Sequence, residues 1–407
     1  SVMYDGSILP FEENTANTQM VVSFAKQTGA SVEAEIGCMG KRETGSGSAG
    51  VGADPDKIYT DQDLAKEFVE ATGIDALACS FGTTHGVYIT KPKLDFDVVR
   101  NVRKKVNIPV VMHLHELTAV CPCYTMLRQD GTICSDCATK GYWNCVKNKC
   151  MKGSLAKSVL AYTEAQFLRY GHYYDKIDLY IAECNFYKNL VEKAHFTHSP
   201  IIKMNNFLPI NQEYKAYYEH DNYILYFGRY AREKGVLTIL KAYAKMHCDE
   251  KLVLVGKGSE EERIKNFVKE HNLEGRVQVN GAIFGEEMDR IIERAKVVLV
   301  PSEWYENGAF VALQALAKGK IVVASDIAGL SEIVQDGETG YLAEPGNPDS
   351  FAIAIQKALN LTETEYRNMS ARIVAYAKKR CDAENYIEKL CKIYEELING
   401  KQHKENG

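Results

Sequence analysis

The sequence predicts an α/β protein built from parallel strand–helix repeats in two lobes. Short apolar runs rich in β-branched residues, at residues 223–227, 297–300 and 321–324, have the length and composition of buried strands. Segments with apolar residues at helical spacing, such as residues 308–319, separate these strands. The length of 407 residues exceeds one ordinary core and indicates two or three domains.

The composition narrows the classes of function. A content of 45% hydrophobic and 25% charged residues is typical of a soluble globular protein. The net charge of -5 argues against a nucleic-acid-binding protein. No run approaches the ~20 apolar residues of a membrane span and no signal peptide is recognised, so we expect a cytoplasmic protein without a transmembrane segment. Because Ser1 directly precedes a predicted strand, we also expect the earlier part of its domain to be missing.

The first third of the chain alternates strands with helices, as parallel repeats do. Four strands are predicted at residues 1–7, 31–37, 75–82 and 108–113, and three helices at residues 14–28, 61–72 and 95–105.

Several stretches of this third resemble the class II fructose- or tagatose-bisphosphate aldolases. They are YDGSILPFEEN, SVEAEIG, ALACSFGTTHGVY, KPKLDF and IPVVMH. The resemblance implies that His85 and His113 correspond to metal ligands and that Asp5 and Glu35 match carboxylates at the barrel mouth. A catalytic zinc normally has three protein ligands and the barrel has eight strands, whereas two ligands and four strands are found here. We therefore expect no aldolase turnover, and His85 is interpreted as a structural remnant.

The stretch from residue 297 to residue 334 predicts a strand, a polar turn, a helix and a second strand. Such a unit places ligands at the carboxyl ends of its strands. The first helical amides, at Gly308, Ala309 and Phe310, favour an anion. Glu306 precedes these amides and Gln314 lies two turns into the helix. The alternative is that Glu306 is a solvated loop carboxylate and Gln314 a surface residue.

A second cluster follows the predicted strand at residues 223–227. Gly228 provides a close turn, and Arg229 and Lys234 come at the strand's carboxyl end. Arg offers a rigid fork that matches phosphate oxygens, and Lys a mobile point charge. Together they suit a diphosphate.

The order GRYAREKG, LVLVGKG, PSEWYENGAFVALQALAKG and ASDIAGLSEIVQDGETGYL resembles the retaining glycosyltransferases of the sucrose synthase-like family, also called family 4 or glycosyl transferases group 1. The resemblance implies a GT-B fold with two Rossmann-like lobes. It assigns the donor diphosphate to Arg229 and Lys234 and the donor sugar hydroxyls to Glu306. Gln314 stands where the family has a ribose-binding glutamate, which weakens nucleotide binding by about 1 kcal/mol or more.

The resemblance continues upstream, to about residue 108. In HLHE, His115 aligns with a family histidine that faces the donor sugar, and Glu116 stands in for an aspartate. The alternative is a histidine that merely ends a strand.

Six of the 12 cysteines fall between residues 121 and 150. The spacing of Cys134, Cys137, Cys145 and Cys150 is compatible with a structural zinc site, and reduced thiols are the alternative.

The predicted organisation joins an aldolase-like partial barrel to a transferase, so that aldolase-like strands occupy sheet positions of the first lobe. Its parts are residues 1–112, the rest of the N-terminal lobe at 113–208 with the insert 121–150, the nucleotide-sugar-binding domain at 222–375, and a terminal helix at 376–400. The last residues, KQHKENG, are expected to be disordered.

The function that follows is a hexosyltransferase-type glycosyltransferase that moves a sugar, with retention, from a nucleotide-diphosphate sugar to an unknown acceptor, for example a glycan or a lipid-linked sugar. No cofactor is required for transfer. The alternatives are a non-catalytic nucleotide-sugar-binding protein and a zinc-dependent ketose-bisphosphate aldolase.

Overall fold

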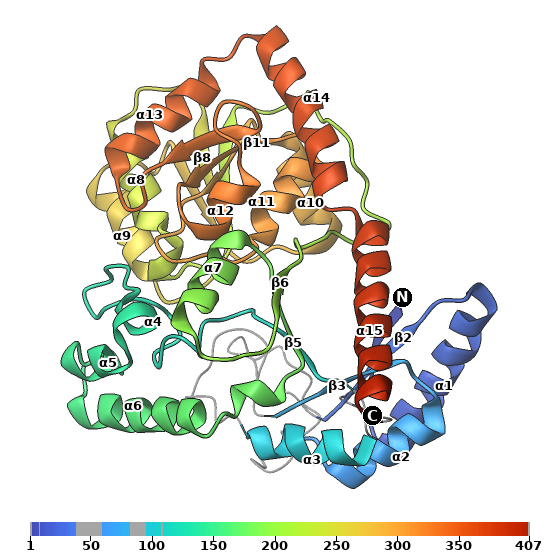
Figure 1. Cartoon of the computed structure of the whole chain (residues 1–407). Coiled ribbons are helices and arrows are strands. Elements are labelled where there is room, and N and C mark those ends of the chain that lie inside the picture. The colour runs from blue at the N-terminus through green and yellow to red at the C-terminus, as the bar shows by residue number, and fades with distance from the viewer. Residues whose placement is uncertain (1, 8, 38–58, 82–94, 107–108, 406–407) are drawn as a thin grey trace. The chain divides into compact units, whose positions relative to one another are not determined.

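The computed structural model describes residues 2–7, 9–37, 59–81, 95–106 and 109–405 (Figure 1). The chain forms two compact units. Unit 1 contains residues 1–111, 175–178 and 387–407, and unit 2 contains residues 112–174 and 179–386. None of the described helices is both long and apolar enough to cross a membrane.

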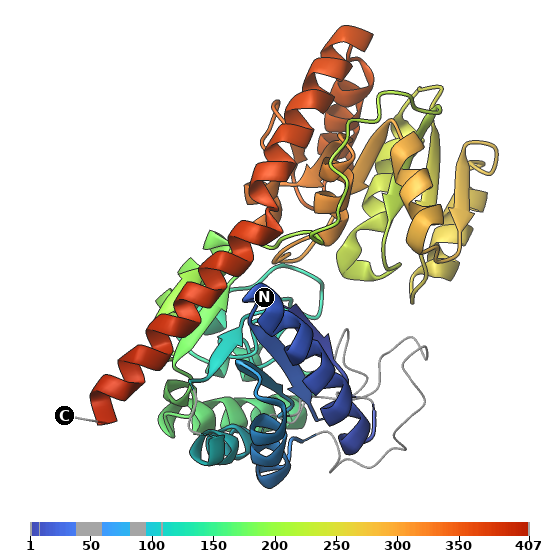
Figure 2. The ribbon, with the colours of Figure 1, turned by 90° about the vertical axis from the view of Figure 1, so that its right-hand side faces the viewer.

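Unit 1 contains a parallel sheet of three strands, β1 (Val2–Asp5), β2 (Val32–Ile36) and β3 (Ala76–Cys79), in that order. The helices α1 (Phe11–Thr28), α2 (Gln62–Thr72) and α3 (Phe96–Val106) follow the pattern predicted from the sequence. Asp61 caps α2 by accepting hydrogen bonds from the amides of Asp63 and Leu64. Figure 2 shows α1 lying along the sheet.

The first part of unit 2 is organised on a second three-stranded sheet, β4 (Val111–His113), β5 (Leu179–Ala182) and β6 (Ile201–Lys203), with β4 beginning at the boundary between the units. The described strands β1–β3 and β4–β6 are therefore hydrogen-bonded as two separate sheets, and of the four aldolase-like strands only β4 joins the later ones. The connecting helices are α4 (Asp136–Lys140), α5 (Trp143–Lys147), α6 (Leu155–Tyr170) and α7 (Asn185–Ala194).

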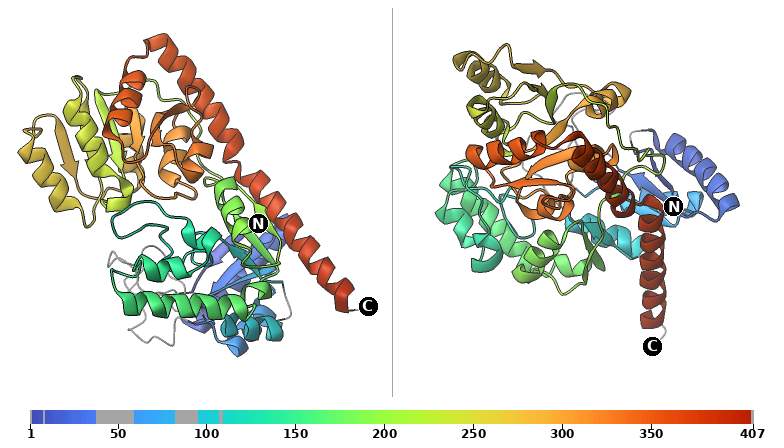
Figure 3. Two further views of the ribbon diagram at one scale, coloured as in Figure 1. Left: turned by 60° about the vertical axis from the view of Figure 1, so that its left-hand side comes forward. Right: turned by 90° about the horizontal axis from the view of Figure 1, so that it is seen from above.

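The rest of unit 2 is a six-stranded parallel sheet in the order β12-β11-β10-β7-β8-β9. Its strands are β7 (Tyr223–Phe227), β8 (Lys251–Val255), β9 (Val277–Asn280), β10 (Val297–Val300), β11 (Ile321–Ser325) and β12 (Gly340–Ala343). Figure 3 shows β9, in yellow, at one edge of this sheet. The order is that of a doubly wound nucleotide-binding sheet, in which the direction of winding reverses between the first and fourth strands, here β7 and β10.

Helices cover this six-stranded sheet and complete one large apolar core. They are α8 (Val236–Lys245), α9 (Glu261–Glu270), α10 (Gly285–Arg294), α11 (Phe310–Ala317), α12 (Ala328–Ile333) and α13 (Pro348–Leu359). All residues of β10 and β11 are buried, and all but Ser325 are aliphatic, as expected for parallel strands covered on both faces.

Two long helices end the chain, α14 (Glu363–Arg380) and α15 (Ala383–Glu405). Thr362 and Glu365 form a capping box that starts α14. The disorder expected for KQHKENG is wrong for most of that segment, since α15 continues to Glu405. Lys, Gln and Glu are good helix formers, so they extend a helix that is already nucleated.

Candidate functional site

The candidate site lies where the six-stranded sheet reverses its winding. β7 and β10 are neighbours there, with Ile224 opposite Val297 and Tyr226 opposite Leu299. Both strands are parallel, so the loops that follow them leave the sheet at the same edge. In doubly wound sheets, ligands bind at this edge. The two clusters that the sequence singled out therefore belong to one place in the fold.

The loop after β7 brings the first cluster close to the loop after β10. Gly228 has a φ of 145°, and Gly235 has a φ of 67°. A side chain on Gly235 would collide with the carbonyl oxygen of Pro301, at the end of β10. Glycine thus permits both the left-handed backbone and the close approach of the two loops.

Lys234 and Glu306 join these two loops through an ion pair. Glu306 is only 9% exposed, and the hydroxyl of Ser302 donates to its Oε1 at 2.7 Å. Burial alone would raise the pKa of Glu306, but the Lys234 charge and the hydrogen bonds from Lys234 and Ser302 outweigh it and lower the pKa. Glu306 is therefore a buried, ionised carboxylate and not a solvated one.

Arg229 lies near the same edge with a different partner. Its guanidinium is 3.3 Å from Glu233, and its side chain is 39% exposed. Lys234 is less exposed, at 21%, and its ammonium lies 5.2 Å from the centre of the Trp304 ring. Both predicted cations are thus present at the switch point, each next to a carboxylate.

The helix α11 begins at Phe310, four residues after Glu306 and two after Gly308. Ala309 provides no side-chain hydrogen bond to the first turn. The amides of this turn keep the partial positive charge that favours an anion. Gln314 is exposed on the same helix.

His115 is connected to the start of α11 through two side chains that the sequence reasoning missed. Its Nδ1 lies 2.7 Å from Oε1 of Glu183, a buried residue directly after β5. The amide of Asn206 donates to Oε2 of Glu183 at 2.7 Å and to the carbonyl oxygen of Gly308 at 3.3 Å. Because a carboxylate only accepts hydrogen bonds, Nδ1 of His115 carries the proton.

Asn307, in the loop after β10, forms a second connection, to the residue that follows β4. It donates to the carbonyl oxygen of Leu114 at 2.8 Å, and its own oxygen is 3.7 Å from the Cys184 sulfur. Glu183, Asn206 and Asn307 all follow the carboxyl end of a strand. That position is the signal in the sequence that could have indicated them.

The described aldolase-like residues are divided between the two units. His85 lies outside the described residues. His113 is in unit 2, where burial, followed by the charge of His115, lowers its pKa to about 4. Asp5 and Glu35 are paired across β1 and β2 of unit 1. Burial, together with the charges of Asp5 and Glu33, raises the pKa of Glu35 to about 7.

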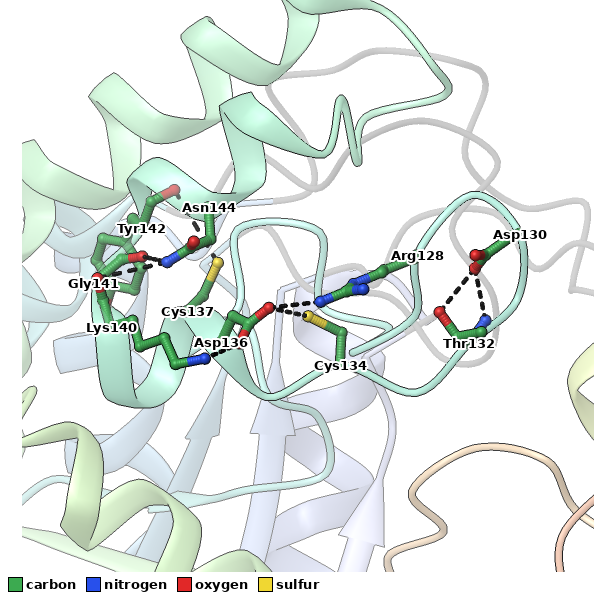
Figure 4. Close-up of polar contacts among 10 residues, drawn as sticks. All are labelled: Arg128, Asp130, Thr132, Cys134, Asp136, Cys137, Lys140, Gly141, Tyr142 and Asn144. Atoms are coloured by element: carbon green, nitrogen blue, oxygen red, sulfur yellow. Dashed lines mark hydrogen bonds and ion pairs between the residues drawn. The ribbon is translucent and has the colours of Figure 1, made fainter.

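The cysteine-rich insert separates one predicted zinc ligand from the other three. Cys137, Cys145 and Cys150 are buried in one cluster with Tyr142 and Ala165. Figure 4 shows Cys134 turned instead toward Asp136, to which its sulfur donates at 3.5 Å.

Thiol–thiol contacts continue within the cluster. A hydrogen bond from Cys145 lowers the pKa of Cys150, and Cys123 donates to the carbonyl oxygen of Cys150 at 3.4 Å. Among the described residues, no three cysteine sulfurs lie within 4.8 Å of one another. Cysteine thiolates suit a soft cation. The sulfur atoms nevertheless lie farther apart here than they would around one bound ion.

The sheet order and the paired switch-point loops define a protein of the GT-B class, with two Rossmann-like lobes. The structure of Anabaena HepE in complex with UDP and glucose is similar, with 16% identity, a TM-score of 0.59, and coverage of 96% of this chain and 97% of that chain. Sucrose-phosphate synthase from Thermosynechococcus elongatus is 18% identical with a TM-score of 0.62, covering 95% and 93%. A glycosyltransferase from Rickettsia africae is 15% identical with a TM-score of 0.56, covering 97% of each.

Two family models match separate parts of the chain. Residues 1–114 match class II fructose-bisphosphate aldolase, and residues 210–380 match glycosyl transferases group 1. These matches confirm both resemblances inferred from the sequence. The GT-B fold is also confirmed, whereas the prediction that aldolase-like strands occupy sheet positions of the first lobe is not met by the described strands β1–β3, which form a sheet of their own.

Proposed function

We propose that this protein is a glycosyltransferase that moves a hexose from a nucleotide-diphosphate sugar to an acceptor with retention. The observation that carries the proposal is the ion pair between Lys234 and the buried Glu306 at the switch point of the sheet. It places a cation, a carboxylate and the uncapped start of α11 at the edge where such sheets bind nucleotides. The structure of HepE with UDP and glucose supports this class of ligand.

In this proposal the leaving diphosphate is stabilised by charge. Cleavage of the sugar–phosphate bond leaves negative charge on the phosphate oxygens, and Arg229, Lys234 and the amides of Gly308, Ala309 and Phe310 stabilise it. Glu306 accepts hydrogen bonds from sugar hydroxyls, and a phosphate group takes over part of its contact with Lys234. Gln314 binds the ribose through its neutral amide. No cofactor is required for these steps.

His115 contributes from the other side of the site. The Glu183 carboxylate holds Nδ1–H, so the ring presents Nε2 to the donor sugar. His115 thus orients the sugar together with Glu306, and Glu183 and Asn206 position both through the link to Gly308. The acceptor, a glycan or a lipid-linked sugar, and the cytoplasmic location stay predictions.

Calorimetric titration with UDP and GDP tests the nucleotide site. We expect one of them to bind and Arg229→Ala to weaken it about tenfold or more, since a charge-assisted hydrogen bond is lost. Arg263→Ala, on the exposed side of α9, is the matched control and should bind as the wild type does. Absence of binding by the wild-type protein would overturn the proposal.

A panel of nucleotide sugars then separates transfer from binding. Release of the nucleoside diphosphate, abolished by Glu306→Gln, supports transfer. Binding without any release favours the non-catalytic alternative. Cleavage of fructose bisphosphate that disappears with chelator would favour the aldolase alternative.

A structural zinc in the insert remains part of the proposal. Cys137, Cys145 and Cys150 share one buried cluster, and Cys123 contacts it. Metal analysis of protein purified without chelator should find about one zinc per chain, lost in Cys145→Ser and kept in Cys248→Ser, a partly buried cysteine elsewhere in unit 2. Less than half an equivalent in the wild-type protein argues for reduced thiols.

A further inference from the structure

The helix α6 exposes a broad apolar face. Seven of its residues are exposed and uncharged: Leu155, Ala156, Val159, Leu160, Thr163, Phe167 and Tyr170. At 100° per residue they span an arc of about 140° on one side of the helix. Leu160, Phe167 and Tyr170 are 65%, 63% and 76% exposed. Contiguous apolar surface of this kind marks an interaction site.

The opposite face of α6 already has its place in the fold. Ser158, Ala161 and Ala165 are buried, and Ala165 packs in the cluster of Cys137, Tyr142 and Cys150. Ser154 caps the helix by accepting a hydrogen bond from the amide of Lys157. The helix is therefore anchored by its small residues and by Tyr162, which packs against the same cluster, whereas Leu160, Phe167 and Tyr170 stay exposed.

Trp143 extends the apolar surface beyond α6. It belongs to α5, is 51% exposed, and its ring meets Tyr162 of α6 edge-on, with the centres 5.2 Å apart. α5 and α6 lie side by side (Figure 1). Exposed tryptophan next to an apolar helix face is typical of side chains that sit between water and lipid.

The charge beside the N-terminal half of α6 is mainly positive, although Lys140 pairs with Asp136 and Glu164 lies later in the helix. Residues 140–157 contain five lysines and no acidic residue, although the chain as a whole has a net charge of -5. All five are exposed: Lys140, Lys147, Lys149, Lys152 and Lys157. Lysines beside an exposed apolar face complement an anionic surface. A second copy docked on the same face would bring ten lysines together, which disfavours self-association.

We propose that α6 and Trp143 dock on the surface of an anionic lipid bilayer. In this arrangement the uncharged arc enters the boundary between headgroups and acyl chains, and the lysines contact lipid phosphates. The helix lies in the plane of the membrane and does not span it. The inference stands whether or not the protein transfers sugar, because it uses none of the residues of the switch-point site.

Sedimentation with vesicles tests the proposal. The full chain should bind vesicles of phosphatidylcholine mixed with phosphatidylglycerol, bind those of phosphatidylcholine alone at least about tenfold more weakly, and dissociate as salt is raised. Leu160→Ser combined with Phe167→Ser should weaken binding at least about tenfold. The matched control is Phe284→Ser combined with Ile353→Ser, two residues of unit 2 that are 82% and 60% exposed and lie outside α6.

Three outcomes overturn the proposal. The first is that wild-type protein does not bind the anionic vesicles, and the second is that the α6 variant binds as tightly as the control. The third is a wild-type dimer in light scattering that the α6 variant abolishes, since the face is then covered by a second copy. Circular dichroism checks that the variant is folded, and Lys147→Glu with Lys149→Glu tests the same surface without altering α6.

Discussion

Nδ1 of His115 lies 2.7 Å from a carboxylate oxygen of Glu183, whose side chain is only 6% exposed. The hydrogen bond to Glu183 is the largest influence on this histidine, and it raises the pKa against the effect of burial. The folded pKa therefore lies above the unfolded value of about 6.5. The pair stabilises the fold fully below that value, and this stabilisation is lost as the pH rises through the folded pKa.

The first prediction concerns this pair. When the chemical shift of a His115 ring proton is followed against pH by NMR, the midpoint pH should be lower in Glu183→Gln than in the wild-type protein. The neutral amide no longer favours the imidazolium. Glu192→Gln, in the helix α7 that follows Glu183, is the matched control. Equal midpoints in Glu183→Gln and wild-type protein would show that the carboxylate does not hold the histidine.

The second prediction concerns the ion pair between Lys234 and Glu306. Lys234→Ala should lower the free energy of unfolding by about 2 kcal/mol, because it leaves a buried carboxylate without its cation. Lys245→Ala, whose pair with Asp349 is at least half exposed on both sides, should change it by about 0.5 kcal/mol or less. Both values come from urea denaturation at neutral pH.

Adding Glu306→Gln to Lys234→Ala should recover part of the loss, since the unpaired charge is then removed. The pKa of Glu306 is lower in the folded protein than in the unfolded chain. Its contribution to the free energy of unfolding is therefore present above the unfolded pKa of about 4.3, and it is lost as the pH falls through the folded pKa. A double variant less stable than Lys234→Ala alone would contradict this account.

The third prediction concerns Gly308. A side chain there would collide with the amide of Asn206 and lie 2.7 Å from Oε2 of Glu183. Gly308→Ala should therefore cost about 1–3 kcal/mol of unfolding free energy and shift the titration of His115. Gly281→Ala is the control, because nothing lies within 4 Å of its new methyl group. Similar stability losses in the two variants would argue against close packing at Gly308.

The fourth prediction concerns Glu35 in unit 1. Its side chain is buried, and its Oε1 has no hydrogen-bond partner among the described residues. Because burial and the neighbouring carboxylates raise its pKa to about 7, the folded chain keeps a proton that the unfolded chain releases near pH 4.3. Stability should fall as the pH rises between these two values.

Glu35→Gln removes this pH-dependent loss. Above pH 7 the variant should be more stable than the wild-type protein, by at most about 4 kcal/mol, and the advantage should shrink toward pH 4. Thermal unfolding across this pH range measures the effect, with the exposed Glu13→Gln as control. A constant difference at all pH values would indicate a cause other than titration.

The sequence by itself was sufficient for the local architecture. Buried β-branched runs predicted β10 and β11, helical spacing predicted α11, and spaced motifs indicated a GT-B fold and an aldolase-like beginning. These signals depend on neighbours within a few positions, because strand and helix periodicity, capping and turn chemistry are local properties. The extension of α15 to Glu405 was missed because its polar residues resemble those of a disordered end.

Only the tertiary structure decided which side chains meet. The link from His115 through Glu183 and Asn206 to Gly308 joins positions up to 193 residues apart that no local pattern connects. The burial of Glu306 likewise depends on packing between distant segments. Which distant residues make contact is decided by how helices and strands bury their apolar faces against one another, and this happens only when the chain folds.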